Sequence, residues 1–124
     1  MADIPDDSEL QLRKFQKELS AGTVSLALLA VLGRSATPMY GYQIAKRLES
    51  LDGVLSGKQS ALYPVLRNLS AAGLLDSHTE PSAAGPPRRY YRITEAGRSH
   101  YRSKCEEWEL TKDVIERFTK GEST

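Results

Sequence analysis

One short segment with β-strand character interrupts a chain that otherwise has the pattern of helices. Residues 74–77 and 88–93 have the composition of short strands, and the glycine- and proline-rich residues 80–87 between them predict a loop. A two-stranded hairpin is only marginally stable alone and has to pack against another element. The sequence therefore predicts a mainly α fold with a small β-hairpin that rests on helices.

Helical patterns lie on both sides of this hairpin. Ser8 is a suitable N-cap for the first helix, and Gly73 and Thr94 are residue types that favour a helix end and a helix start. The predicted helices are residues 8–20, 24–32, 40–51, 58–72 and 94–120. Helices followed by a hairpin and a further helix have the outline of a winged helix-turn-helix domain.

The length and the cysteine content exclude several classes of protein. The 124 residues are enough for one domain, and a domain this small buries only about two-thirds of its unfolded surface, so a core shared with a second copy would help. Cys105 is the single cysteine, and it lacks zinc-site spacing with either histidine, so no disulfide, metal site or cofactor is predicted. The chain shows no nucleophile–base pair or phosphate loop, which argues against an enzyme.

The hydropathy pattern argues against a membrane protein. The first seven residues are acidic and polar, unlike a signal peptide. The longest apolar run, residues 24–32, has nine residues, whereas a bilayer span needs about twenty. The sequence therefore predicts a soluble, cytoplasmic protein with no membrane partner.

Positive charge is concentrated in the middle of the chain. The whole chain has a net charge of +1, but residues 58–104 carry eight basic and three acidic side chains, or +5. Residues 1–57 carry −1 and residues 105–124 carry −3. Neutralisation of phosphates supplies most non-specific affinity for nucleic acid, so the middle segment is the candidate surface for double-stranded DNA.

Three sequence blocks resemble the PadR family of bacterial transcriptional regulators. They are residues 40–48, the run Leu-Tyr-Pro-Val-Leu-Arg-Asn-Leu at 62–69 with Ala-Gly-Leu-Leu at 72–75, and the run from Gly85 to Gly97. The resemblance covers residues 19–118 and implies a homodimeric winged helix-turn-helix repressor on an inverted-repeat operator. The single C-terminal helix of roughly 25 residues resembles the short branch of the family, which includes a multidrug-sensing regulator.

The resemblance divides the chain and assigns DNA contacts. It implies a DNA-binding domain at 8–93 that includes the N-terminal helix and a dimerisation helix at 94–120. Residues 1–7 are expected to be a disordered tail, because chain termini are often not ordered. Candidate contacts lie on three elements: the recognition helix, the helix before it and the basic hairpin. Polar side chains of a recognition helix contact base edges and phosphates. These residues are Tyr40, Gln43, Lys46, Lys58, Gln59, Ser60, Tyr63, Arg67, Arg88 and Arg89.

Some of these assignments have a simpler structural alternative. Tyr63 could be a partly buried helix residue with a local hydrogen bond, Arg67 a solvated surface cation, and Tyr42 is expected to pack inward. Alternation along residues 88–93 puts Arg89 on one face of the hairpin and Arg88 on the other, and only one face can point at DNA.

The last helix carries a seam at spacings of four and three residues. This spacing predicts a coiled contact of the last helix with a second copy or with the first helix. The predicted dimer seam comprises Phe15, Leu19, Tyr101, Cys105, Trp108 and Ile115. Trp108 also aligns with a tryptophan that stacks planar ligands in the drug-sensing branch, which implies an effector pocket of Leu26, Ala30, Tyr101, Cys105, Trp108 and Lys112. Because Lys112 is a cation, a phenolic or carboxylated aromatic effector is the better candidate.

Two function classes remain after these observations. The leading hypothesis is a DNA-binding regulator, and the alternative is a winged-helix protein-interaction module that has lost DNA binding. A cysteine on a helix seam is more often a small hydrophobe than a redox sensor, so Cys105 is assigned to packing. Salt dependence discriminates between the two functions, because a DNA binder loses affinity steeply as salt rises.

Overall fold

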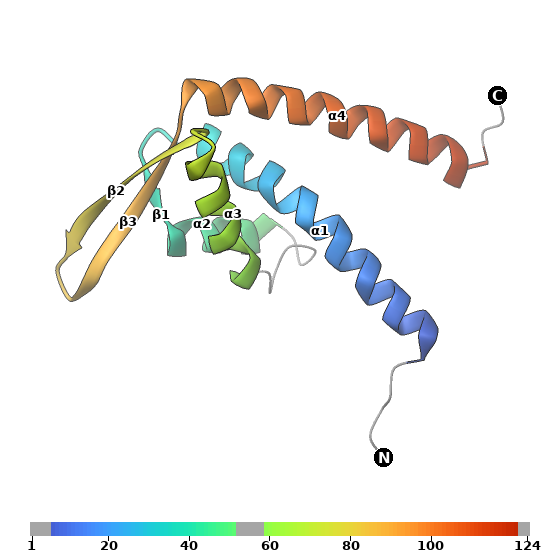
Figure 1. Cartoon of the computed structure of the whole chain (residues 1–124), viewed down its shortest axis with the longest axis horizontal. Helices are drawn as coiled ribbons and strands as arrows, with labels where there is room; N and C mark the ends of the chain where they lie inside the picture. The colour runs from blue at the N-terminus through green and yellow to red at the C-terminus, as the bar shows by residue number, and fades with distance from the viewer. Residues whose placement is uncertain (1–5, 52–58, 122–124) are drawn as a thin grey trace, which may run out of the picture.

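The protein folds as a helical body with one three-stranded sheet (Figure 1). The computed structural model describes residues 6–51 and 59–121, with the side chains of residues 50, 51 and 59–61 excepted. In chain order the elements are α1 Asp7–Gly33, β1 Met39–Tyr40, α2 Gly41–Leu51, α3 Gln59–Ala71, β2 Leu75–Ser82, β3 Gly85–Ile93 and α4 Glu95–Thr119.

The first helix is continuous, so the predicted division into two helices is wrong. Gly22 does not interrupt α1, because a mid-helix glycine costs only about 1 kcal/mol and the hydrogen-bonded backbone runs through it. The N-cap is Asp6, whose carboxylate accepts from the Glu9 N–H at 2.8 Å, in place of the predicted Ser8. Asp7, assigned to the predicted tail, is therefore the first residue of α1.

The sheet is larger than the predicted hairpin. Its strand order is β1-β3-β2, all antiparallel, and the two-residue strand β1 was not predicted. Strands β2 and β3 extend through residues 80–87, which were expected to form a loop. Pro81 lies at an irregularity in the register, and prolines are tolerated at such positions and at strand edges. The result is a long wing formed by β2 and β3.

The core joins the second half of α1 to α2, α3 and the sheet. Its fully buried side chains are Leu28, Leu29, Ile44, Leu62 and Leu66. On α2 the buried stripe comprises residues 41, 44, 45 and 48, one step away from Tyr42. Tyr42 is therefore 58% exposed, and the expectation that it packs inward is wrong.

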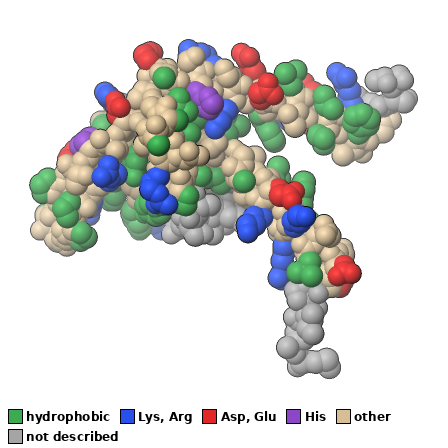
Figure 2. Space-filling model, in the orientation of Figure 1, with side chains coloured by type: hydrophobic (Ala, Val, Ile, Leu, Met, Phe, Trp, Pro, Cys, Tyr) green, Lys and Arg blue, Asp and Glu red, His purple; other side chains and the backbone are tan. Residues whose placement is uncertain are grey.

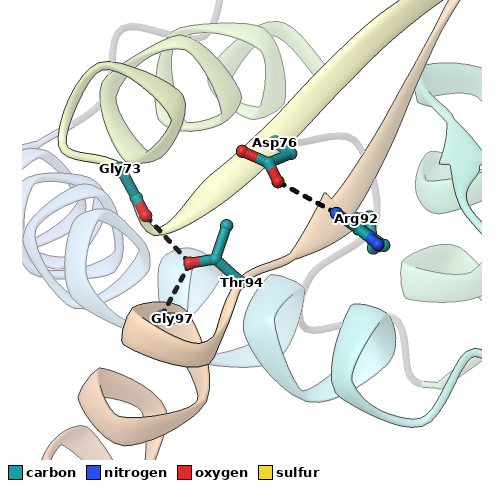
Figure 3. A network of polar contacts seen from close by, with 5 residues as sticks. All are labelled: Gly73, Asp76, Arg92, Thr94 and Gly97. Atoms are coloured by element: carbon teal, nitrogen blue, oxygen red, sulfur yellow. Dashed lines mark hydrogen bonds and ion pairs between the residues drawn. The ribbon is translucent and has the colours of Figure 1, made fainter.

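The link from α3 to the wing and on to α4 is fixed by two residues (Figure 3). Gly73 has a φ of 76° and ends α3 as predicted, with its N–H donating to the Ser70 carbonyl. The Thr94 hydroxyl accepts from the Gly97 N–H at 3.0 Å and donates to the Gly73 carbonyl at 2.8 Å. The predicted N-cap of α4 thereby also ties the start of α4 to the end of α3.

The two longest helices diverge away from the sheet (Figure 1). We call residues 7–20 of α1 the α1 arm and residues 108–119 of α4 the α4 arm. Large apolar side chains are exposed on both, namely Leu10, Leu12, Phe15 and Leu19 on the first and Trp108, Leu110, Val114, Ile115 and Phe118 on the second. Apolar surface of this kind indicates a surface that a partner covers.

By length and composition α1 could also cross a membrane. An 18-residue window in it reaches a mean hydropathy of 1.2. The core helix of a soluble protein meets the same criterion, and α1 supplies Leu28 and Leu29 to the core. The helix is therefore weak evidence for a membrane span.

Candidate nucleic-acid interface

The start of α2 and the exposed side of α3 fit closely at Gly41 and Tyr63. A Cβ atom built on Gly41 would lie 2.9 Å from Cε1 of Tyr63, so only glycine allows this ring to lie on the α2 backbone. The Tyr63 side chain is 47% exposed, and its hydroxyl makes no hydrogen bond with another described residue. Tyr63 is thus held in place by its ring beside Gly41, and its hydroxyl is not bonded to any residue that the structure describes.

Three predicted contact residues lie near the phenol of Tyr91, which belongs to the same buried cluster as Leu62 and Leu66 of α3. Burial raises the pKa of the Tyr91 phenol, the Arg89 cation opposes that rise, and the Tyr63 hydroxyl and the Arg67 cation also lie near enough to affect it. Arg89 donates from Nη1 to Ser77 Oγ at 2.9 Å. Tyr63 and Arg67 of α3 and Arg89 of β3 therefore form one surface, which we call the α3–wing seam.

Arg88 lies on the opposite face of the wing, as the alternation predicted. Its guanidinium is 4.5 Å from the ring centroid of Tyr40, and the Tyr40 ring meets Tyr90 edge-on at 5.4 Å. Tyr90 in turn stacks on His78, whose Nε2 lies 2.6 Å from Glu80 Oε2. The two adjacent arginines of β3 are thus held by different partners on different faces.

The predicted contacts of α2 have local structural partners. Gln43 accepts from the Tyr40 N–H at 3.1 Å, which caps the start of α2 and leaves the two amide donors of its side chain. Lys46 lies 5.6 Å from the ring centroid of Tyr42 and 3.9 Å from Glu49 Oε2. Both residues are exposed, so each can reach a phosphate without being released from the core.

The first turn of α3 is described only in its backbone. Gln59 and Ser60 belong to α3, but their side chains, and the whole of Lys58, lie outside the described residues. The N-terminal end of α3 points to the same side of the molecule as the tip of the wing (Figure 1). Figure 2 shows Lys and Arg side chains over the wing and α3 on the face in view.

A second candidate site is a groove of about 550 Å³ between α1 and α4. Leu19, Gly22 and Leu26 line it from α1, and Lys104 and Trp108 line it from α4. Trp108 is 40% exposed, and its indole is available to a ligand or a partner. Of the predicted effector pocket, Leu26 and Trp108 are the residues that line this groove.

The other predicted pocket residues have different surroundings. Tyr101 packs against the core, and a hydrogen bond with Cys105, assisted by burial, raises the pKa of its phenol. Lys112 pairs with Glu109 at 2.9 Å, which raises the pKa of the Lys112 ammonium. Ala30 is half-buried on α1.

Lys104 is one of the groove residues that the sequence did not single out. Its Nζ donates to Ser25 Oγ on α1 at 2.6 Å, and burial lowers the pKa of its ammonium group. The signal was present in the spacing, because Lys104 lies one helical turn before Trp108 on the same face of α4. The groove therefore combines an indole and an ammonium group with the carboxylates of Glu18 and Glu107, which also line it.

The predicted dimer seam splits into two parts. Phe15, Leu19, Trp108 and Ile115 are exposed, whereas Tyr101 and Cys105 are half-buried within their own chain. Among the described residues, no group of three or more His, Cys, Asp or Glu side chains could hold a metal ion.

Comparisons with known proteins place this architecture in one family. Residues 28–103 match the transcriptional regulator PadR-like family. A transcriptional regulator from Clostridium thermocellum is 35% identical with a TM-score of 0.72, over 82% of this chain and 97% of that one. An uncharacterized protein from Lysinibacillus sphaericus is 28% identical over 83 residues, which are 66% of this chain and 76% of that one.

A structure described as a PadR family transcriptional regulator, from Eggerthella lenta, is also similar. It is 28% identical with a TM-score of 0.72, over 91% of this chain and 94% of that chain. The family match covers α2, α3 and the wing, which carry the predicted DNA contacts. The chain therefore belongs to the PadR-like family of transcriptional regulators and carries the DNA-binding winged helix of that family.

Proposed function

We propose that the protein is a sequence-specific repressor that binds its operator through α3 and the wing. The observation that carries this proposal is the α3–wing seam, where Arg89 is bonded to Ser77 and Tyr63, Arg67 and Arg89 all lie near enough to the Tyr91 phenol to affect its pKa. Arginine binds guanine edges or phosphates with paired donors, and a neutral tyrosine hydroxyl donates one hydrogen bond. Because Arg89 and Tyr63 are held by Ser77 and Gly41, these donors are positioned before DNA arrives.

The wing presents a second set of donors from its other face. Arg88 and Tyr40 form one stacked unit beside the start of α2, where a phosphate would also meet the first N–H groups of a helix. A phosphate contact from this unit orients the protein on the duplex and does not read sequence. In this proposal Arg89 belongs to the α3–wing seam and Arg88 binds the backbone.

We further propose that the repressor acts as a homodimer in the cytoplasm. The apolar side chains of the α1 arm and the α4 arm are exposed in the single chain, and a second copy would cover them. A two-fold axis would place two α3 helices in successive major grooves, so the operator would be an inverted repeat with half-sites about 34 Å apart. Sedimentation equilibrium should give twice the chain mass.

Selection of binding sites from random duplex DNA at two salt concentrations tests the DNA proposal. We expect enrichment of an inverted repeat, weaker binding at the higher salt, and a roughly 5- to 150-fold loss of affinity for Arg67→Ala, since a specific arginine contact contributes about 1–3 kcal/mol. The matched control is Arg102→Ala, which removes an exposed cation of α4, away from α3. No enrichment by a folded dimer would favour the protein-interaction module instead.

The groove between α1 and α4 is the proposed effector site, as in the drug-sensing branch of the family. Trp108 would stack a planar aromatic molecule, and Lys104 would pair with a carboxylate or phenolate on it. Lys112 is bound to Glu109 and is less available for this role. A ligand that separates α1 from α4 would alter the distance between the two α3 helices of the dimer and release the operator.

The single tryptophan makes this proposal directly measurable. Benzoates and hydroxycinnamates should quench the fluorescence of Trp108 saturably, and Lys104→Gln should weaken the quenching by the carboxylates more than that by uncharged analogues. Lys112→Gln is the matched control and should leave the quenching unchanged. Quenching that does not saturate at high micromolar ligand would contradict the effector site.

A further inference from the structure

The α1 arm carries a cluster of cations that the assigned sites do not use. Arg13, Lys14 and Lys17 are exposed, and none of them makes a hydrogen bond or an ion pair with another residue that the structure describes. They lie outside the basic middle segment of the sequence. Figure 2 shows Lys and Arg side chains along this part of α1.

The helical phase fixes which side of α1 these cations occupy. Steps of three and four residues lead from Lys14 and Lys17 to Val24 and Leu28, which are buried. That buried side of α1 packs on α2, α3 and β3. In the α1 arm the same side extends beyond the core, and it carries positive charge there.

The opposite side of the α1 arm is apolar. Leu12, Phe15 and Leu19 lie at the same helical phase as Leu26, which lines the groove against α4. The arm therefore keeps most of its apolar surface apart from its cations. Leu12, Phe15 and Leu19 turn toward α4 and the cations turn away from it, whereas Leu10 lies on the cationic side. The apolar side suits the proposed dimer contact and leaves the cationic side free in the dimer.

The cationic side faces the part of the molecule that meets DNA in the proposed function. The N-terminal end of α3 and the tip of the wing lie on the side of the molecule remote from α4 (Figure 1). The cations of the α1 arm project toward that same side, because their face of α1 is the face that packs on α3 farther along the helix. A duplex bound to α3 would therefore lie on the side of the molecule toward which these cations project.

We propose that Arg13, Lys14 and Lys17 bind the sugar–phosphate backbone of the operator between the two half-sites. This inference rests on the proposed DNA-binding function. In a dimer joined through the arms, the two cationic faces lie near the two-fold axis and meet the central phosphates. Three flexible cations without a fixed partner suit phosphate neutralisation and not base readout, so they add affinity without adding sequence preference.

The test is the salt dependence of operator binding by a triple variant. Arg13→Gln/Lys14→Gln/Lys17→Gln keeps helix-forming residues and removes three cations per chain. Each lost phosphate contact should make the slope of log K against log salt shallower by about 0.9, so the change should lie between about 2 and 5 for a dimer. The matched control is Arg102→Gln/Arg117→Gln/Lys120→Gln on α4 and its C-cap, which removes the same charge and should leave the slope near that of the wild type.

Two further readouts separate this role from a structural one. The order of preferred sites in a selection should be unchanged, and protection of the central operator backbone from hydroxyl radicals should be lost in the α1 arm variant alone. Equal slopes for wild type and variant, or a variant that no longer dimerises, would overturn the inference while leaving the proposed function standing. A folded wild type that does not bind DNA would contradict both.

Discussion

The part of α1 near the sheet and the part away from the sheet contain similar apolar residues but have different surroundings. Near the sheet, Leu28 and Leu32 of α1 are buried with α2, α3 and β3. Away from the sheet, Leu12 and Phe15 of the same helix are more than half exposed. One continuous helix therefore belongs to a complete core at one end and to an incomplete one at the other.

This difference shows which part of the molecule can fold alone. Helix formation is cooperative but depends mainly on packing of an apolar face, so the sheet end of α1 is stabilised within one chain. The α1 arm and the α4 arm expose apolar side chains without a cover within one chain, and in the proposed dimer a second copy would supply one. The core thus sets the winged helix, and the arms set the spacing of two winged helices in the proposed dimer.

The largest expected effect comes from one leucine at each end of α1. Leu28→Ala should lower the free energy of unfolding by about 2–5 kcal/mol, because a fully buried side chain is lost and leaves a cavity. Leu12→Ala removes the same atoms from an exposed site and should act only where the dimer forms. Urea unfolding at two protein concentrations a hundredfold apart separates the two effects.

The comparison would fail if the two variants behaved alike. Leu12→Ala should weaken dimerisation in sedimentation equilibrium, while Leu28→Ala should lower stability at both concentrations. A loss of several kcal/mol for Leu12→Ala in the dilute protein would mean that the arm belongs to the core of a single chain.

Two helical glycines give the next contrast. A Cβ atom on Gly97 would lie within 3 Å of the Leu74 carbonyl oxygen and of Ile93 Cγ1, so Gly97→Ala forces the backbone apart and should cost about 1–3 kcal/mol. A Cβ atom on Gly22 meets nothing within 4 Å, and Gly22→Ala should stabilise α1 by about 1 kcal/mol. Thermal unfolding of both variants checks the opposite signs. Destabilisation by Gly22→Ala would place a partner helix against this glycine, which lines the groove.

The two helix N-caps should differ by a smaller amount. Thr94→Ala removes the acceptor for Gly97 N–H and the donor to Gly73, and should cost about 1 kcal/mol of global stability. Asp6→Ala removes one similar bond at the tip of the α1 arm, where local fraying precedes global unfolding. Hydrogen exchange should show faster exchange confined to the first turn of α1 for Asp6→Ala. Equal losses of global stability would show that the arm unfolds together with the core.

Sequence patterns predicted most of the fold because local chemistry determined it. Gly73 and Thr94 end and start helices through their own backbone freedom and side-chain oxygen, and both predictions are confirmed. The misplaced features depend on contacts between distant segments. Strand β1 exists because Met39 and Tyr40 pair with Tyr91 and Tyr90, and two residues carry no periodicity of their own.

In the candidate site too, features set by residue type could be predicted, and features set by contacts between distant segments could not. Arg67 and Arg89 could be singled out from charge and from the resemblance to the family. Their common proximity to Tyr91 could not be predicted, because it depends on the packing of α3 against the sheet. Lys104 was missed because its surroundings come from Ser25, 79 residues earlier. Residue type indicates what a side chain can bind, whereas tertiary packing decides which side chains act together.

The smallest expected effect concerns two lysines of α4 with opposite pKa shifts. Burial lowers the pKa of Lys104 from 10.5, which means that its charge is partly desolvated in the folded protein. Because the unfolded chain solvates this charge fully, the charge lowers the free energy of unfolding near neutral pH. Glu109 raises the pKa of Lys112, so the charge of Lys112 favours the folded state. Lys104→Met should therefore raise the free energy of unfolding at pH 7, by less than about 1 kcal/mol because the site is partly exposed, while Lys112→Met should lower it slightly.

The pH dependence distinguishes this burial effect from a simple gain of apolar contact. The unfolded chain holds the Lys104 proton up to about pH 10.5, whereas the folded chain releases it at a lower pH. Between these two pKa values the unfolded state binds more protons, so the stability of the wild type increases as the pH rises. The advantage of Lys104→Met should consequently be full at pH 7 and shrink toward pH 10.5. A variant less stable than the wild type at pH 7 would show that the 2.6 Å hydrogen bond to Ser25 outweighs the cost of burial. In that case Lys104 would hold α1 to α4 in the absence of effector, and an anionic ligand would have to compete with Ser25 for the ammonium group.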